Sequence, residues 1–186
     1  MAFRLTKAYP RLWSLDTGVA MVVTDLHGDW DTYVRYRDRF IELRAAGQAD
    51  CLIVTGDLIH REPDAGADRS LDIVLDILAL REDYGDAIVY LCGNHELPHL
   101  YGFVLGKGNT EYTPSFEATL SQSGRRGDIL ALFESLPFFI RTAAGVSITH
   151  AGASAPLADR AQAARLLRSA SKARHSIMVS CERGRA

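Results

Sequence analysis

Four short apolar runs are spaced along the chain and indicate buried strands. They cover residues 19–23, 51–54, 87–91 and 146–148. Each run is continuous rather than alternating and is rich in β-branched residues, which is typical of strands buried on both faces of a parallel sheet. We therefore expect four central strands in an open sheet.

Segments with helical periodicity separate the first three runs. Apolar residues recur at helical spacing over residues 31–46 and 70–81. The order strand, helix, strand, helix, strand predicts parallel crossovers, so the fold class is α/β. A further helix is expected over residues 128–136. Residues 97–127 show no clear period and are expected to form a long excursion that contains one short helix.

Length and composition favour one globular domain spanning residues 1–186. Of the 186 residues, 47% are hydrophobic and 24% are charged, and the formal net charge is -2. These values exclude a largely disordered chain and a wholly basic nucleic-acid binder. No apolar stretch approaches the roughly 20 residues that cross a bilayer, and three cysteines without CxxC spacing favour a reducing compartment. We therefore expect a cytoplasmic protein that does not bind membranes.

The C-terminal segment, residues 156–186, differs from the rest in charge. It contains seven basic residues against Asp159 and Glu182, and its leucine and alanine spacing suggests a basic amphipathic helix. We interpret this segment as a solvated helix face rather than a nucleic-acid or membrane patch. Nucleic acid is therefore not an expected partner, and the sequence assigns no oligomeric state.

A small cluster of polar residues follows each apolar run. The clusters are Asp25-Leu26-His27-Gly28-Asp29, Gly56-Asp57-Leu58-Ile59-His60-Arg61, Gly93-Asn94-His95-Glu96 and His150-Ala151-Gly152. Because the carboxyl ends of strands in an open parallel sheet face one crevice, we expect these side chains to converge. One such cluster alone is weak evidence, but four in this order are a strong signal of a site.

The residue types in these clusters suit a pair of divalent cations. Asp25 and His27 are two positions apart at a strand end, so in extended chain their side chains would point to the same side and grip one ion. Asp57 offers a carboxylate that can bridge two ions, and Asn94 and His150 suit the second. Mixed nitrogen and oxygen ligands without thiolate favour Mn, with Fe or Zn as alternatives.

Such a pair of ions would support phosphoester hydrolysis. Two ions about 3.5–4 Å apart can hold a bridging hydroxide and clamp a phosphoryl group for in-line attack. Arg61 could present a bidentate fork to phosphate, and His95 could protonate the leaving alkoxide.

Other polar residues are given structural roles. We expect Asp29 or Asp31 to cap the helix that starts near Thr32. His99 and His175 have no polar cluster around them and are expected on the surface.

With these four clusters, residues 18–155 resemble the calcineurin-like metallophosphoesterase superfamily, and most closely its phosphoprotein phosphatase branch. The resemblance implies a four-layer α/β/β/α sandwich, with helices outside two packed mixed sheets and a dinuclear metal site at the strand ends. It also implies roles for the site residues: Asp25, His27 and Asp57 would hold the first metal, Asp57, Asn94 and His150 the second, His95 would donate the proton, and Arg61 would bind phosphate with help from Asn94.

The chain departs from the phosphoprotein phosphatase pattern at His60. That branch places an Asp immediately before the Arg, where it orients the catalytic His. A neutral imidazole at this position can accept a hydrogen bond, but it cannot stabilise an imidazolium as a carboxylate does, so we expect a weaker acid step. Symmetrical dinucleoside-tetraphosphate hydrolases also lack Asp here, and residues 95–100 look somewhat like theirs.

A second departure concerns the end of the chain. The family has another metal-binding His well downstream of the His150 position, and His175 is the only candidate before the chain ends at Ala186. We therefore expect the second half of the sandwich to be truncated.

We therefore interpret the chain as a metal-dependent phosphoesterase that hydrolyses phosphomonoesters, with phosphoserine or phosphothreonine proteins as substrates, by attack of a metal-bridged hydroxide. Asp57, His60 and His95 form the expected catalytic set. The alternatives are a dinucleoside polyphosphate hydrolase acting on a nucleotide substrate, and a truncated metal- or phosphate-binding module with little turnover.

Overall fold

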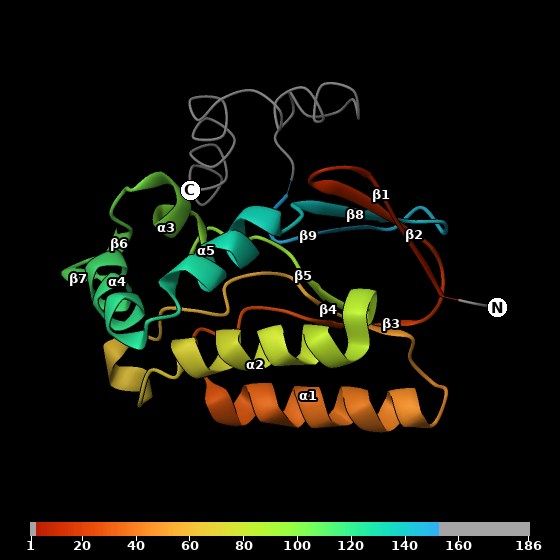
Figure 1. Ribbon diagram of the computed structural model, residues 1–186, viewed down its shortest axis with the longest axis horizontal. Coiled ribbons are helices and arrows are strands. Elements are labelled where there is room, and N and C mark those ends of the chain that lie inside the picture. Colours follow the sequence, from red (N-terminus) through yellow and green to blue (C-terminus); the bar gives the residue numbers. More distant parts are fainter. Residues whose placement is uncertain (1–2, 153–186) are drawn as a thin grey trace.

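The computed structural model describes residues 3–152, which form two packed sheets, a two-stranded hairpin and five α-helices (Figure 1). The strands are β1 (Arg4–Tyr9), β2 (Leu12–Thr17), β3 (Ala20–Val23), β4 (Cys51–Val54), β5 (Ile88–Tyr90), β6 (Gly106–Lys107), β7 (Thr110–Glu111), β8 (Phe139–Thr142) and β9 (Ser147–Thr149). The α-helices are α1 (Trp30–Ala45), α2 (Ser70–Tyr84), α3 (Leu97–Tyr101), α4 (Tyr112–Ser123) and α5 (Arg126–Ser135), and single 3-10 turns lie at Pro63–Ala65 and Gly85–Ala87. The segment 156–186 and His175 lie outside the described residues.

The central position of β4 in the parallel sheet explains why the sequence of this strand is apolar throughout. The sheet has the order β3-β4-β5, and all its pairs are parallel, as the crossover pattern predicts. Leu52 and Val54 of β4 pack with the helices on one face, whereas Cys51 and Ile53 pack against the second sheet on the other. Strand β4 is therefore buried on both sides, as predicted.

The expectation that all four runs are central strands holds only for β4. Strand β5 is buried throughout but lies, like β3, at an edge of the parallel sheet. Strand β3 is an edge of the parallel sheet, and its Val22 is 46% exposed. Strand β9 belongs to the second sheet, where it pairs antiparallel with β8 at the edge, and the neighbouring Val146 is 56% exposed. A run of three to five apolar residues is too short to distinguish an edge strand from a central one.

The second sheet has the order β1-β2-β8-β9 and packs on the parallel sheet through Trp13, Leu15 and Ile140. Two of its strands come from residues 4–17, where the sequence pattern predicts no element. The described residues therefore contain an α/β/β arrangement, in which α1 and α2 cover the outer face of the parallel sheet (Figure 1). The fourth layer and the truncation of the second half remain predictions.

The helices confirm the predicted helix positions except in the long excursion over residues 97–127. Helices α1, α2 and α5 lie within a few residues of their predicted bounds, and the Asp29 side chain caps α1 by accepting from the Thr32 backbone N–H at 3.1 Å. The excursion contains two helices rather than one, because α4 buries Tyr112, Phe116 and Leu120 at helical spacing. Within residues 3–152, no helix has the length and apolar character needed to span a membrane.

Two glycines allow the loops after β4 and β5 to meet. Gly56 has a φ of 104°, and a Cβ there would lie 2.5 Å from the Gly93 backbone nitrogen and 2.6 Å from the Gly93 Cα. A Cβ on Gly93 would lie 2.2 Å from Oδ1 of Asp57. Only glycine fits both positions, and this close approach brings Asp57 beside the residues that follow Gly93.

We predict that Gly56→Ala destabilises the fold by about 2–3 kcal/mol, because the new methyl group meets backbone atoms and the backbone has a positive φ. Urea unfolding of both proteins measures the change. The control is Gly127→Ala in α5, where a Cβ meets nothing within 4 Å and helix propensity rises, so its stability should not fall. Equal effects of the two substitutions would contradict this account.

Candidate active site

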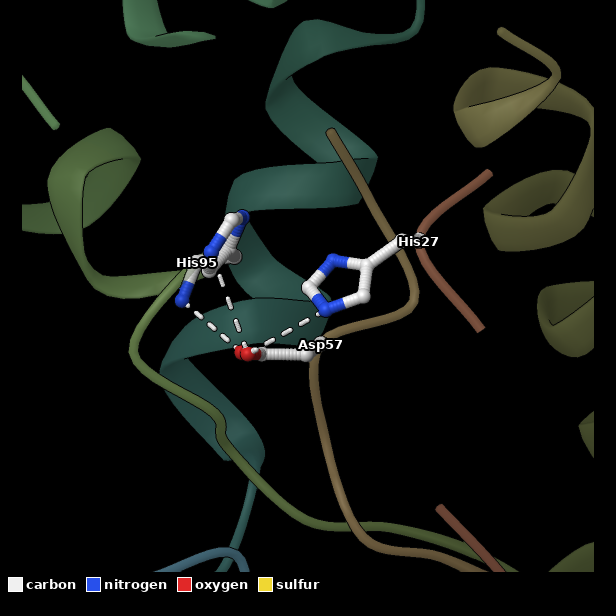
Figure 2. Close-up of side chains that lie close together, drawn as sticks. All are labelled: His27, Asp57 and His95. Carbon is white, nitrogen blue, oxygen red and sulfur yellow. Dashed lines mark hydrogen bonds and ion pairs between the residues drawn. The ribbon is translucent and has the colours of Figure 1, made fainter. Parts of the chain in front are cut away.

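The buried carboxylate of Asp57 lies at the centre of the candidate site. Asp57 follows β4 and is only 4% exposed. Its Oδ2 lies 3.9 Å from Nε2 of His27, 3.9 Å from Nε2 of His95 and 3.3 Å from Nε2 of His150. Figure 2 shows the rings of His27 and His95 converging on this carboxylate from two sides. The four polar clusters therefore meet in one place, although His150 arrives from the second sheet.

Backbone carbonyls fix which nitrogen the site histidines present. Nδ1 of His150 lies 3.0 Å from the Thr55 carbonyl, and Nδ1 of His27 lies 3.3 Å from the Ile59 carbonyl. A carbonyl only accepts, so Nδ1 of each ring carries the proton that is donated to it. The Nε2 atoms are left facing Asp57, and Nε2 of His150 also lies 2.9 Å from Oδ1 of Asn94.

The pairing of Asp25 with His27 that the sequence predicts is not the grouping found. Ligand atoms of Asp25 group with Asp57 and His150, whereas those of His27 group with Asp57 and His95, in each case within 4.8 Å of one another. The period-two argument fails because Asp25 and His27 have φ values of 22° and 43° and so are not in extended chain.

Unusual backbone conformation is concentrated at this site. Among residues 3–152, the non-glycine residues with positive φ are Asp25, His27, Asp57 and His60. Such conformations cost about 1–3 kcal/mol each and persist where the surrounding structure enforces them, often at functional sites. Here the Asp57 carbonyl accepts from the backbone N–H groups of Leu26 and His27 at 3.0 and 2.9 Å, which holds the loop after β3 against the loop after β4.

Asp57 and His150 stabilise each other in their charged forms. Burial alone would raise the pKa of Asp57, but the hydrogen bond and charge of His150 outweigh it and lower that pKa. For His150, burial lowers the pKa, but the hydrogen bond and charge of Asp57 dominate and raise it to about 9. The donor set fits divalent cations, since it combines carboxylate oxygens, imidazole nitrogens and the Asn94 amide oxygen.

A family model described as calcineurin-like phosphoesterase matches residues 19–175. The chain belongs to the calcineurin-like phosphoesterase family. Membership implies hydrolase activity on phosphoesters with the help of divalent metal ions, and the candidate ligands around Asp57 agree with it. Comparison with curated proteins gives no match.

Glu96 holds together the two loops that carry the site of this phosphoesterase. Its carboxylate is fully buried and accepts from the backbone N–H groups of Asp57, Leu58 and Gly93 at 3.1, 3.1 and 2.8 Å. The hydroxyl of Tyr90 also donates to it at 2.7 Å. Glu96 stands in the third polar cluster, but the sequence pattern assigns it no role. The signal was an acidic residue placed directly before an apolar helix start.

His60 contacts His95, the residue expected from the sequence to donate the proton. Nδ1 of His60 lies 3.1 Å from Nδ1 of His95, and burial lowers the pKa of His60 to about 2 and that of His95 to about 4. The expectation that His99 lies on the surface was wrong. His99 is 5% exposed, and its Nε2 lies 2.9 Å from Nε2 of His60. Helix α3 directs the His99 side chain into the core, and the residues next to His99 in the sequence do not indicate this direction.

Arg61 lies beside the loop that carries His27. Its Nε and Nη2 donate to the Ala65 carbonyl at 3.0 and 2.7 Å, and its Nη1 lies 3.4 Å from Oδ2 of Asp29, the residue that caps α1. The guanidinium is therefore held by its own loop and by the start of α1. Its contact with phosphate remains a prediction.

The buried, neutral His60 predicts loss of stability in acid. Its folded-state pKa lies below the unfolded value of about 6.5, so the unfolded chain binds more protons between these values. The free energy of unfolding should therefore fall as the pH drops below about 6.5, with His60 contributing about 1.4 kcal/mol per pH unit. Denaturant unfolding from pH 7 to 4 measures this slope. His60→Phe should give a shallower slope, and an unchanged slope would contradict the prediction.

Proposed function

We propose that this phosphoesterase hydrolyses phosphomonoesters, with phosphoserine and phosphothreonine in proteins as its substrates. The observation that supports this most is the position of Asp57, whose buried carboxylate has three imidazole nitrogens within 3.9 Å. A carboxylate removed from water is costly unless positive charge surrounds it, and divalent ions would supply that charge. The resemblance of the four clusters to phosphoprotein phosphatases supports the choice of substrate.

The residues around Asp57 divide into ligands for two ions. Asp57 would be shared by both, with His27 on one and Asn94 and His150 on the other. Asp25 is grouped with Asp57 and His150, so its carboxylate would be a further ligand in this pair of ion sites. When bound, such ions polarise a phosphoryl group and lower the pKa of water. The backbone carbonyls behind His27 and His150 fix the ring orientation that this ligation needs.

His95 and Arg61 would act on the substrate itself. Nε2 of His95 lies 3.9 Å from Oδ2 of Asp57, so it faces the same space as the ligands and can pass a proton to the leaving alkoxide oxygen. Burial holds the pKa of His95 at about 4, and a bound phosphate dianion beside the ring would raise it. Arg61 would contact the phosphate with its guanidinium at the edge of the site.

We predict that hydrolysis of p-nitrophenyl phosphate depends on added Mn²⁺ and that Asp57→Asn lowers kcat/KM by at least about 100-fold, because the amide cannot neutralise the ions. Activity assays with a metal titration by calorimetry test this, with the exposed Asp83→Asn on α2 as the control. Hydrolysis rates that stay the same without Mn²⁺, or in Asp57→Asn, would contradict the proposal. One tight ion without turnover would indicate a binding module. Faster cleavage of a dinucleoside tetraphosphate than of a phosphoserine peptide would favour the nucleotide substrate.

A second prediction separates proton donation from binding. His95→Gln should lower kcat for a phosphoserine peptide by about 100-fold or more, because an alkoxide leaves poorly without a proton. The loss should be much smaller for p-nitrophenyl phosphate, whose leaving group is stable as an anion. Steady-state kinetics on both substrates measures the ratio. Equal losses on both substrates would assign His95 to binding rather than to proton transfer.

A further inference from the structure

Four side chains form a line of hydrogen bonds that leads from His95 away from Asp57. Nδ1 of His95 meets Nδ1 of His60 at 3.1 Å, and Nε2 of His60 meets Nε2 of His99 at 2.9 Å. Nδ1 of His99 then meets Oε1 of Glu117 at 2.8 Å. Glu117 lies on α4, in a segment where the sequence pattern predicts no site residue. The three histidines and Glu117 are called the relay below.

The relay is shielded from water over most of its length. His60 is 2% exposed and His99 is 5% exposed. The ring of Tyr112 stacks on His60 with centroids 5.6 Å apart, and Phe116 packs edge-on against His60 and His99 at 5.6 and 5.1 Å. Water therefore does not compete for the hydrogen bond between His60 and His99, and the buried nitrogens of these two rings need their partners within the relay.

The carboxylate at the end of the relay sets the direction of every bond in it. A carboxylate only accepts, so His99 donates from Nδ1 and, as a neutral ring, accepts at Nε2. His60 must then donate from Nε2 and accept at Nδ1. His95 must therefore donate from Nδ1, so its Nε2 carries no proton in the neutral ring. The reverse order would place the lone pair of the His99 Nδ1 against an ionised carboxylate at 2.8 Å.

Arg126 keeps Glu117 suited to this role. Its Nε donates to Oε2 of Glu117 at 2.9 Å, while Oε1 accepts from His99. Burial raises the pKa of Glu117, but the hydrogen bonds and charges of Arg126 and His99 dominate and lower it below the usual value. Glu117 therefore stays ionised and remains an acceptor near neutral pH.

We propose that Glu117 is a positioning residue that sets the tautomer of His95 through His99 and His60. Nε2 of His95, which faces Asp57 at 3.9 Å, then carries no proton in the neutral ring and is the atom that takes up and delivers the proton. The catalytic consequence rests on the proposed function of His95, whereas the tautomer itself does not. Glu117 thus supplies, two rings away, the carboxylate that position 60 lacks.

The experiment measures tautomers and kinetics on the full chain. Two-bond ¹⁵N–¹H spectra of protein labelled with ¹⁵N-histidine report which ring nitrogen carries the proton, and the His95 and His60 signals are assigned by their loss in His95→Gln and His60→Phe. We expect Nδ1–H on His95 in the wild type. In Glu117→Ala the His95 signals should shift toward the Nε2–H form, and kcat for a phosphoserine peptide should fall about 10-fold with KM unchanged.

Three further variants separate positioning from folding. Glu117→Gln keeps the size of the side chain but has one acceptor oxygen, which faces Arg126, so its NH2 donates to Nδ1 of His99; this variant should shift the His95 tautomer and lower kcat as Glu117→Ala does. Arg126→Gln removes the tie between α4 and α5 but leaves the Glu117 bond to His99, and it should retain the His95 tautomer and most of kcat. His99→Phe fits beside Phe116 and breaks the relay, so it should reproduce Glu117→Ala even if that variant folds poorly.

Each outcome decides the matter. A wild-type His95 tautomer in both Glu117→Ala and His99→Phe would overturn the proposal. Equal losses in Arg126→Gln and Glu117→Ala would also overturn it, since helix packing alone would then explain them. A shifted tautomer with unchanged kcat would uphold the relay and instead contradict the proton-donor role proposed for His95.

Discussion

The site depends on one costly arrangement, a carboxylate buried at the end of the central strand. Removing an ionised carboxyl group from water costs several kcal/mol unless charge or hydrogen bonds replace the lost hydration. Around Asp57 the replacement comes from His150, from the His95 backbone N–H at 3.0 Å, and from the convergence of His27. The glycine contact between the loops, the strained backbone and the buried Glu96 all serve to keep that convergence in place.

Much of this fold was predictable because the central strand must be apolar on both faces. That requirement marks β4 in the sequence, and periodicity marks α1 and α2 on its covered side. The same reasoning could not place β9, since a short apolar run reads alike in either sheet and at an edge. Helix α4 was missed although Tyr112, Phe116 and Leu120 recur at helical spacing, because Gly and Thr around them obscured the period.

The identity of the site residues was more predictable than their grouping. Polar residues directly after buried strands had to meet at one edge, and Asp57, Asn94 and His95 do so. The partners of Asp25 were not predictable, because the turn after β3 leaves the extended conformation on which the spacing argument relied. His99 and Glu117 were missed for a different reason: their contacts join residues 18 to 39 positions apart, and nothing local reveals them.

The relay changes how the histidine at position 60 is understood. A carboxylate beside a catalytic histidine does two things: it fixes the tautomer, and it stabilises the imidazolium by charge. Hydrogen-bond direction passes through a chain of neutral rings without loss, so Glu117 can perform the first task from two rings away. Coulomb energy falls with distance, so it performs the second task poorly. The arrangement therefore preserves the orientation of His95 while leaving its proton affinity low, and the negative charge that favours a proton on that ring comes from Asp57, whose Oδ2 lies 3.9 Å from its Nε2.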